Sequence, residues 1–245
     1  MQERLKIAAL GGLTGAAVVV LVMAAAAALN ILPVASDARL QSYLLAHPKL
    51  VVEMQTLAEA QQAEETRQAQ LATIKRIGLK TMLDPKVAYV TGPASAKNTI
   101  IEFYDYNCGH CRNNAAVVKA YYEKHKTDTR FAFIEFPIFG NASATAAQAS
   151  VAARSQEGKF LAFHFELMDK GAADSGTVLA AAQTAQLDVA KLMTDMRAPA
   201  AEKSLLAGYR VARQMQFNGT PMFIVNGQVH EGEITEAELK KLIKT

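Results

Sequence analysis

The chain has 245 residues, of which 51% are hydrophobic and 20% are charged, and its formal net charge is +3. This length is enough for one domain with additional segments. The charged residues are spread along the chain, without the basic blocks and interleaved aromatic residues of a nucleic-acid-binding protein. We therefore expect no nucleic acid among its partners.

The first segment, residues 1–36, contains an uncharged apolar stretch at residues 7–29, preceded by Arg4 and Lys6. As a helix this stretch would be about 35 Å long, enough to cross a hydrocarbon core of about 30 Å. The basic residues before it would keep the N-terminus in the cytoplasm. We predict a single-pass signal-anchor in the inner membrane, with the rest of the chain in the periplasm. The alternative is a cleaved signal peptide, which would leave a soluble periplasmic protein.

The second segment, residues 37–83, predicts a helical arm. Asp37 is a suitable N-cap for a helix that reaches Ala46, and His47-Pro48 ends it and begins a second helix that extends to about Leu83. Polar residues interrupt the heptad pattern of leucines in this second helix, so a continuous coiled coil is not predicted. The arm is either a solvated spacer or a segment through which the chain forms homo-oligomers.

The third segment, residues 84–245, predicts a globular domain. A short strand, a longer strand, a helix and a third strand follow one another at residues 86–91, 98–106, 113–125 and 130–136. Two strands joined by a helix in this order predict a parallel pair with a crossover helix.

Residues 141–217 predict a helical insertion, and we expect its last helix to end at Asn218-Gly219 in the left-handed conformation. Two more strands follow, joined by a turn at Asn226-Gly227. Thr235 and Glu238 form the pattern of a capping box at the start of a final helix.

Cys108-Gly109-His110-Cys111 contains both cysteines of the chain, and it lies between a predicted strand and a predicted helix. This context is typical of a thiol–disulfide redox site. A structural zinc site would need a second pair of ligands, and the other histidines are isolated. A purely structural disulfide across such a short loop would constrain the unfolded chain only weakly. The motif therefore favours redox chemistry, with no cofactor beyond a Cys108–Cys111 disulfide.

The position of the motif at a helix start predicts different roles for its residues. The free N–H groups there favour a thiolate on Cys108, and such sites lower a thiol pKa from about 8.5 to roughly 3.5–7.5. Cys111, one turn further on the same face, is the thiol expected to resolve a mixed disulfide. His110 is expected to tune the pair. Glu102, on the preceding strand, is either an edge residue or a buried proton relay for Cys111.

Thr220-Pro221 precedes a predicted strand. In the trans form Pro221 only begins the strand. In the cis form the backbone of Thr220 would be exposed and could pair with an extended substrate segment.

Several motifs together resemble the thioredoxin superfamily and its DsbA-like branch. They are residues 101–111, Glu135-Phe136-Pro137 and residues 219–223. The resemblance implies an α/β thioredoxin fold with an inserted helical domain. It also implies that Cys108 is the nucleophile, Cys111 the resolving thiol and Glu102 the buried acid. Pro221 would be the cis-proline and Thr220 its substrate-facing neighbour.

The resemblance implies a thiol–disulfide oxidoreductase that acts on reduced or misoxidised exported proteins. It would exchange electrons with a membrane partner, either a quinone-linked oxidase or an electron donor. The Gly-His pair between the cysteines matches protein disulfide isomerase rather than the best-known DsbA oxidases, so the direction of exchange stays open. Residues 37–83 are similar to the N-terminal extension of ScsC-like proteins, some of which oligomerise through it.

Two alternatives use other features of the chain. The same thiols could bind copper(I) in a protein of envelope metal handling, because soft ligands select this ion. The chain could also be a tethered adaptor whose N-terminal helices are the functional part.

Overall fold

The computed structural model describes residues 37–244. The chain divides into two compact units, with the boundary between Gln62 and Ala63. Within the described residues, no helix is both long and apolar enough to cross a membrane. The predicted anchor at residues 7–29 lies outside the described residues.

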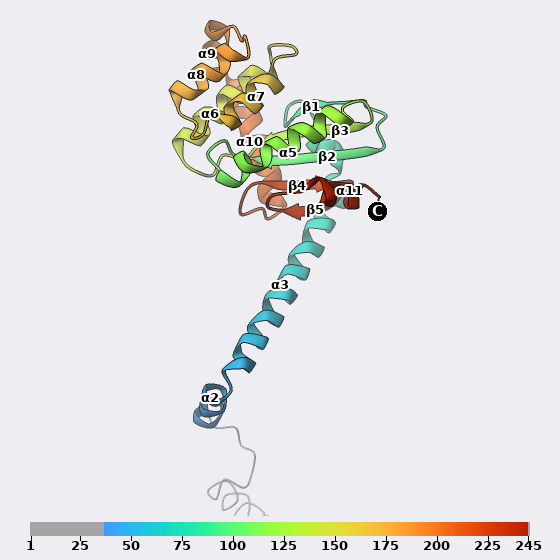
Figure 1. The fold of residues 1–245 in the computed structure, drawn as a ribbon, viewed down its shortest axis with the longest axis vertical. Helices are drawn as coiled ribbons and strands as arrows, with labels where there is room; N and C mark the ends of the chain where they lie inside the picture. The colour runs from blue at the N-terminus through green and yellow to red at the C-terminus, as the bar shows by residue number, and fades with distance from the viewer. Residues whose placement is uncertain (1–36, 245) are drawn as a thin grey trace, which may run out of the picture. The chain divides into compact units, whose positions relative to one another are not determined.

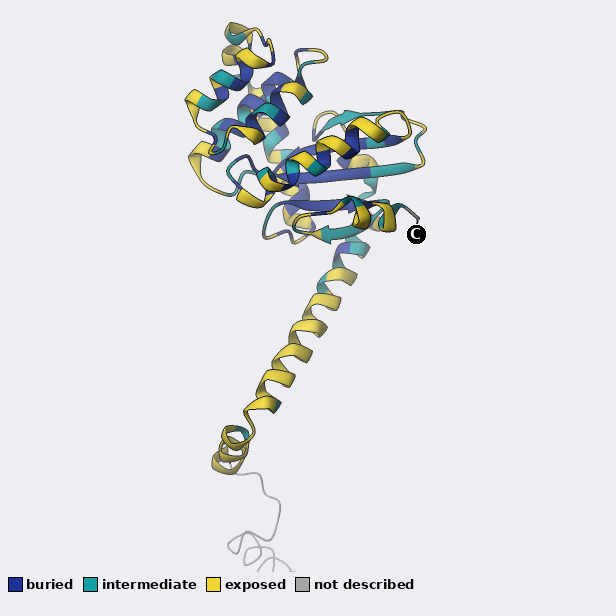
Figure 2. Ribbon diagram, in the orientation of Figure 1, coloured by how far each residue is buried: buried dark blue, intermediate teal, exposed yellow. Residues whose placement is uncertain are grey.

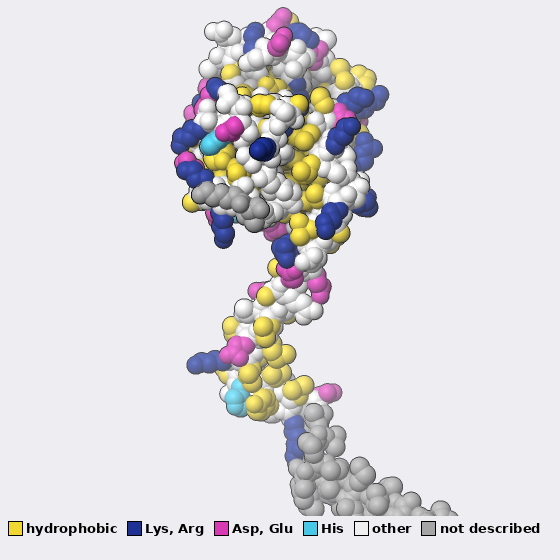
Figure 3. Space-filling view, turned by 90° about the vertical axis from the view of Figure 1, so that its right-hand side faces the viewer, with side chains coloured by type: hydrophobic (Ala, Val, Ile, Leu, Met, Phe, Trp, Pro, Cys, Tyr) yellow, Lys and Arg dark blue, Asp and Glu magenta, His cyan; other side chains and the backbone are white. Residues whose placement is uncertain are grey.

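The described part of the first unit is helical. Helix α2 covers Asp37–Ala46 and helix α3 covers Pro48–Ile77, and α3 continues into the second unit (Figure 1). Figure 3 shows hydrophobic side chains gathered on α2 and the start of α3. The large exposed ones are Leu40, Tyr43, Leu45, Val51, Val52, Met54 and Leu57.

The second unit includes the end of α3 because residues there are buried in its core. Ile74 is 8% exposed, and Met82 of the short helix α4 (Leu79–Met82) is fully buried. The prediction of one helix to about Leu83 is wrong at Gly78, whose φ of 73° is left-handed and favours glycine. The unit thus begins earlier in the chain than Asp84, where the sequence pattern places the domain start.

A five-stranded mixed sheet forms the centre of the second unit, in the order β1-β3-β2-β4-β5. The strands are β1 (Tyr89–Thr91), β2 (Asn98–Tyr104), β3 (Thr129–Glu135), β4 (Met222–Val225) and β5 (Gln228–Glu231). The central pair, β2 and β3, is parallel and joined by helix α5 (Gly109–His125), which confirms the predicted crossover. The other pairs are antiparallel, and Asn226-Gly227 forms the predicted turn between β4 and β5.

Alternate residues of β2 point to opposite faces of the sheet, as the pleat requires. Ile101 and Phe103 belong to one core cluster, which includes side chains of α10. Ile100 and Tyr104 belong to the other, which includes side chains of α5 and α7. Figure 2 shows the buried sheet between these layers. Both faces of the central strands are therefore covered.

Five helices lie between β3 and β4, as the predicted insertion requires: α6 (Asn141–Ala153), α7 (Phe160–Asp169), α8 (Ser175–Thr184), α9 (Val189–Met196) and α10 (Pro199–Gln214). Alanines on α6 are fully buried, so this helix packs closely against α9 and α10. The prediction for the end of α10 is wrong. The helix ends before Asn218-Gly219, and the left-handed residue is Gln216, with a φ of 58°.

The last helix, α11 (Glu236–Lys244), begins at the predicted capping box. The Thr235 amide donates to Glu238 Oε2 at 2.8 Å, and the Glu238 amide donates to Thr235 Oγ1 at 3.2 Å.

Candidate active site

The turn between β2 and α5 is held by the buried carboxylate of Asp105. Its Oδ1 accepts a hydrogen bond from the Asn107 amide at 2.8 Å, and its Oδ2 accepts from the amides of Ile138 and Phe139 at 2.7 and 3.1 Å. The Cys108 amide donates to the carbonyl oxygen of Asp105 at 3.1 Å. These bonds set the position at which the following helix begins.

Cys108 is the N-cap residue of α5, and Cys111 lies one turn further along the helix. Both are free thiols, 3% and 0% exposed. Cys108 Sγ donates a hydrogen bond to the carbonyl oxygen of Thr220 at 3.1 Å, and the Thr220–Pro221 peptide bond is cis. The structure thus brings Cys108, Cys111, Thr220 and Pro221 together from two distant parts of the chain.

The surroundings of the two thiols shift their pKa values in opposite directions. A hydrogen bond from Cys111 and the N–H groups of Cys111 and His110 lower the pKa of Cys108 to about 5, although burial of the thiol opposes this. Burial, the hydrogen bond to Cys108 and the nearby Glu102 charge raise the pKa of Cys111 well above its usual range. The Cys108 thiol therefore loses the proton that it donates to the Thr220 carbonyl well below neutral pH, whereas Cys111 keeps its proton.

Glu102 lies on β2, between its neighbours Phe133 of β3 and Phe223 of β4. It is 3% exposed, and its Oε2 has no hydrogen-bond partner within residues 37–244. Burial raises its pKa to about 8. Because β2 is the central strand, Glu102 is not an edge residue. Alternation places its side chain on the face of Ile100 and Tyr104, the face that α5 covers.

His110 is on the outside of the site, with its side chain 75% exposed. Its Nδ1 lies 2.8 Å from Glu233 Oε1, and this hydrogen bond and charge, together with the charge of Cys108, raise the pKa of His110. The Glu233 carbonyl accepts from His230 Nε2 at 2.9 Å, and Ile234 exchanges two hydrogen bonds with Asn114 of α5. The segment after β5, through Glu233 and Ile234, therefore contacts both His110 and α5.

Residues 85–245 match the sequence model of the family described as Thioredoxin. The chain belongs to the thioredoxin family. This confirms the resemblance to the thioredoxin superfamily that the motifs predict.

Three solved structures are similar to this thioredoxin-family chain. A thioredoxin-like oxidoreductase from Silicibacter pomeroyi is 35% identical, with a TM-score of 0.62, and the match covers 67% of this chain and 95% of that chain. BcfH from Salmonella enterica Typhimurium is 27% identical, with a TM-score of 0.71 and coverages of 85% and 93%. A linker-deletion mutant of Proteus mirabilis ScsC is 23% identical, with a TM-score of 0.66 and coverages of 87% and 95%.

Two curated proteins also match, the Na(+)/H(+) antiporters NhaA 3 of Salinispora tropica and NhaA 1 of Salinispora arenicola. They are 24% and 25% identical over 162 residues, or 64% of this chain. The thioredoxin-family chain spans 24% of the length of these antiporters.

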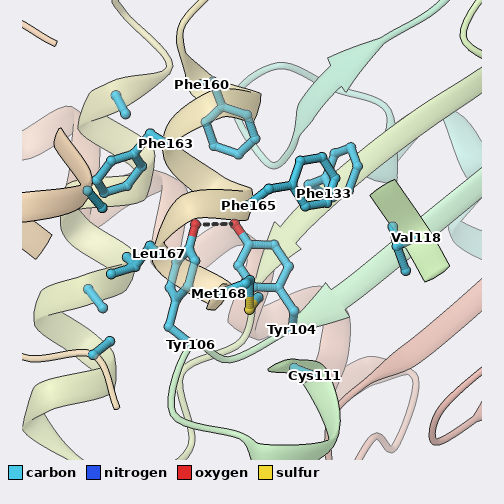
Figure 4. Packing of buried hydrophobic residues seen from close by; sticks show 14 of the residues in the cluster. Tyr104, Tyr106, Cys111, Val118, Phe133, Phe160, Phe163, Phe165, Leu167 and Met168 are labelled. Carbon is cyan, nitrogen blue, oxygen red and sulfur yellow. Dashed lines mark hydrogen bonds between the residues drawn. The ribbon is translucent and has the colours of Figure 1, made fainter. Parts of the chain in front are cut away.

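Sequence reasoning missed the residues that support the site of this thioredoxin-family chain. Asn107 and Ala173 exchange two hydrogen bonds, which tie the cysteine loop to the segment between α7 and α8. Figure 4 shows the hydroxyl groups of Tyr104 and Tyr106 beside each other among buried side chains. Tyr106 also contacts His164 Nδ1 at 3.0 Å. Tyr104, Tyr106 and Asn107 lie within the motif at residues 101–111, but their contacts do not follow from it. Ala173 and His164 lie far from the motif in sequence and carried no signal.

In the part of the chain that the structure describes, no group of three or more His, Cys, Asp or Glu side chains is placed to hold a metal ion.

Proposed function

We propose that this chain is a thiol–disulfide oxidoreductase of exported proteins, with Cys108 as the nucleophile and Cys111 as the resolving thiol. The observation that carries the proposal is the opposite shift of the two pKa values at the start of α5, beside the Thr220 carbonyl. A pair with one thiolate and one retained thiol is what sequential disulfide exchange needs. The name of the Silicibacter protein, an oxidoreductase, is consistent with it.

In the oxidising direction, a substrate thiolate attacks Sγ of Cys108 in the Cys108–Cys111 disulfide. A mixed disulfide forms on Cys108, and Cys111 leaves as a thiolate that takes up a proton. A second substrate thiolate then attacks the substrate sulfur of the mixed disulfide and releases the Cys108 thiolate. Two electrons pass from the substrate dithiol to the protein. In the reducing direction, Cys108 attacks a substrate disulfide and Cys111 resolves the product.

Glu102 is proposed to exchange the proton of Cys111. Its pKa of about 8 is close to neutral, so the carboxyl can hold or release a proton under working conditions. Its effect on the Cys111 pKa supports the proximity of the two groups. Burial raises the pKa of Glu102, and burial also raises the pKa of Cys111. The same buried environment therefore keeps Cys111 protonated and brings the pKa of its proposed proton acceptor close to neutral.

Thr220 and Pro221 are proposed to contact the substrate, with His110 at the exposed side of Cys108. The carbonyl of Thr220 lies against Cys108 Sγ, so a substrate sulfur bonded to Cys108 would lie beside this peptide. Thr220 is half-buried, and its backbone is proposed to pair with an extended segment that carries the substrate cysteine. Reduced and misoxidised proteins both offer such segments.

The depressed pKa of Cys108 stabilises the reduced form and so makes the disulfide form an oxidant. The same thiolate is the attacking group that an isomerase uses when it is kept reduced. We propose a membrane partner, a quinone-linked oxidase or an electron donor, that sets which form predominates. The signal-anchor at residues 7–29 would place the catalytic domain in the periplasm near that partner; cleavage there would leave the same domain soluble.

The exposed apolar side chains of the first unit support a homo-oligomerisation role for the arm at residues 37–83. A groove of about 600 Å³ between α2 and α3 is lined by Leu40, Leu44, Leu45, Val51 and Val52. Exposed apolar surface of this kind marks protein interfaces.

The function is tested on the full-length chain by the thiol state of Cys108 and Cys111 across glutathione ratios, and by turnover of a reduced and a scrambled substrate protein. We expect a reversible two-electron disulfide and a loss of turnover in Cys108→Ser. Cys111→Ser should still attack and should accumulate the mixed disulfide. Full activity of Cys108→Ser, or no reversible disulfide, would overturn the proposal.

A further inference from the structure

Two neighbouring side chains attach the loop between β2 and α5 to the helical insertion. Strand β2 ends at Tyr104, and Tyr106 and Asn107 lie in a turn directly before Cys108. Tyr106 is 1% exposed, and its hydroxyl group contacts side chains of α6 and α7. Asn107 exchanges two hydrogen bonds with Ala173, at 3.1 and 2.7 Å. The residues next to the nucleophile are thus attached to a part of the chain that contains neither cysteine.

The hydroxyl contacts of Tyr106 allow one order of donors and acceptors. Glu135 is paired with the guanidinium of Arg154 and can only accept, so Ser150 Oγ donates to Glu135 Oε1 across 2.8 Å. Tyr106 Oη must then donate to Ser150 Oγ, also across 2.8 Å. Because its one proton is used there, Tyr106 accepts from His164 Nδ1 at 3.0 Å. A chain of donors therefore runs from α7 through the cysteine loop to α6 and β3.

His164 is consistent with this order of donors. Burial lowers its pKa to about 3, so the imidazole is neutral at neutral pH. A neutral imidazole has one N–H group, and the chain of donors requires it on Nδ1. A buried polar group that loses its partner destabilises the fold, so each hydrogen bond in the chain restricts where the Tyr106 ring can lie.

Tyr104 belongs to the same group of side chains but is held differently. It is also 1% exposed, its hydroxyl group donates to Glu135 Oε1 at 2.8 Å, and it contacts Ser150 Oγ at 3.1 Å (Figure 4). Its backbone, however, is part of the sheet, and its carbonyl oxygen accepts from the Phe136 amide at 2.8 Å. Sheet pairing therefore fixes Tyr104 independently of its hydroxyl group, whereas Tyr106 lies in a turn.

We propose that Tyr106 and Asn107 are positioning residues for Cys108, through which the helical insertion fixes the start of α5. Ser150 and His164 act through Tyr106, and the segment between α7 and α8 acts through Asn107. The inference rests on the proposed redox role of Cys108. Its thiolate is stabilised by N–H groups at the helix start, and a displaced loop would weaken those interactions. The insertion thereby contributes to the acidity of the nucleophile.

The test compares Tyr106→Phe with the matched control Tyr104→Phe, since each removes one buried hydroxyl group from the same set of contacts. Thiolate absorbance against pH, measured on the reduced full-length chain, gives the midpoint of Cys108. Tyr106→Phe should make the thiol about ten-fold less acidic, whereas Tyr104→Phe should change its acidity less than about two-fold. Urea unfolding should show a loss of stability in both variants, so a shift confined to Tyr106→Phe is not a general effect of destabilisation.

Asn107→Ala is a second variant, which leaves every buried hydroxyl group in place and should also make Cys108 less acidic. Tyr106→Phe should in addition lower by about ten-fold the equilibrium constant for reduction of the disulfide by glutathione, because a less acidic Cys108 stabilises the reduced form less.

An unchanged Cys108 midpoint in Tyr106→Phe, or an equal shift in Tyr104→Phe, would overturn the role of Tyr106. An unchanged midpoint in Asn107→Ala would overturn that of Asn107. The absorbance comparison requires neither turnover nor a reversible disulfide, so failure of this inference and failure of the proposed function are separate results.

Discussion

At the scale of single residues, Glu102 connects stability to pH. Its pKa is raised to about 8 in the folded chain, against about 4.3 in an unfolded one. Below about pH 4 the carboxyl is protonated in both states and adds no pH dependence. Between about pH 4.3 and 8 the unfolded state loses this proton while the folded state keeps it, so the free energy of unfolding falls as the pH rises. Above the folded pKa the loss is complete.

We therefore expect Glu102→Gln to match the unchanged chain at pH 4 and to be more stable at pH 8. The difference should be several kcal/mol, because each pKa unit corresponds to about 1.4 kcal/mol. Urea unfolding at the two pH values measures it. Glu157→Gln, at an exposed position, is the control and should change little at either pH. The same pH dependence in Glu102→Gln and the unchanged chain would show that Glu102 is not protonated when folded.

A second residue prediction concerns the Cys108 thiolate. With a pKa of about 5, Cys108 is about 99% ionised at pH 7. Thiolate absorbance against pH should show half-ionisation near pH 5, and Cys108→Ser should remove the signal. Cys111→Ala should raise the Cys108 pKa, since the hydrogen bond from Cys111 is the largest cause of its depression. A midpoint at about 8.5 would contradict this.

For Glu102, the sequence predicted the strand but not whether that strand lies at the edge or in the interior of the sheet. The pattern placed Glu102 on a strand, but an acid in an apolar strand fits an edge as well as an interior. The sheet order decided between them, because β2 has a neighbour on each side. Glu233 carried no signal at all, since nothing in the sequence relates it to His110.

At the scale of elements, Gly208 sets how closely α10 packs on β3. A Cβ added there would lie 2.9 Å from Ile134 Cγ2 and 3.1 Å from the Glu135 carbonyl oxygen. In an open helix Gly→Ala stabilises by about 1 kcal/mol. Here we expect Gly208→Ala to destabilise by about 1–3 kcal/mol, because helix and strand must separate. Urea unfolding measures the change.

The control for Gly208→Ala is Gly219→Ala, where no atom lies within 4 Å of an added Cβ. It should leave the free energy of unfolding nearly unchanged. A stabilised Gly208→Ala would mean that α10 does not pack closely against β3.

The helices and strands themselves were largely predictable because their signals are local. Capping residues, apolar periodicity and the Asn-Gly turn act over a few residues, and the structure has the elements that they predict. The errors at Gly78 and at the end of α10 occurred where a glycine signal was missed or misplaced. Gln216 adopts the left-handed conformation although nothing in its residue type favours it.

At the scale of the whole molecule, oligomerisation through the arm is open to a direct test. Leu45 is 75% exposed and Val52 is 64% exposed in the first unit. If copies of the chain associate there, Leu45→Glu with Val52→Glu should reduce the mass measured by light scattering to that of one chain, because burying the new charges costs free energy. Gln55→Glu with Gln62→Glu adds the same charge at exposed polar positions and should keep the oligomer. Equal masses for all three chains would make the arm a spacer.

By itself, the sequence determined the order of elements, the parallel pair around α5 and the place of Cys108 at a helix start, because these follow from interactions between neighbours along the chain. It also indicated the family, through motifs that are short and continuous. Only the tertiary structure decided that Thr220 meets Cys108 and Glu233 meets His110, across 112 and 123 positions. Such contacts depend on how sheet and helices pack, and the spacing of residues in the sequence does not record that packing.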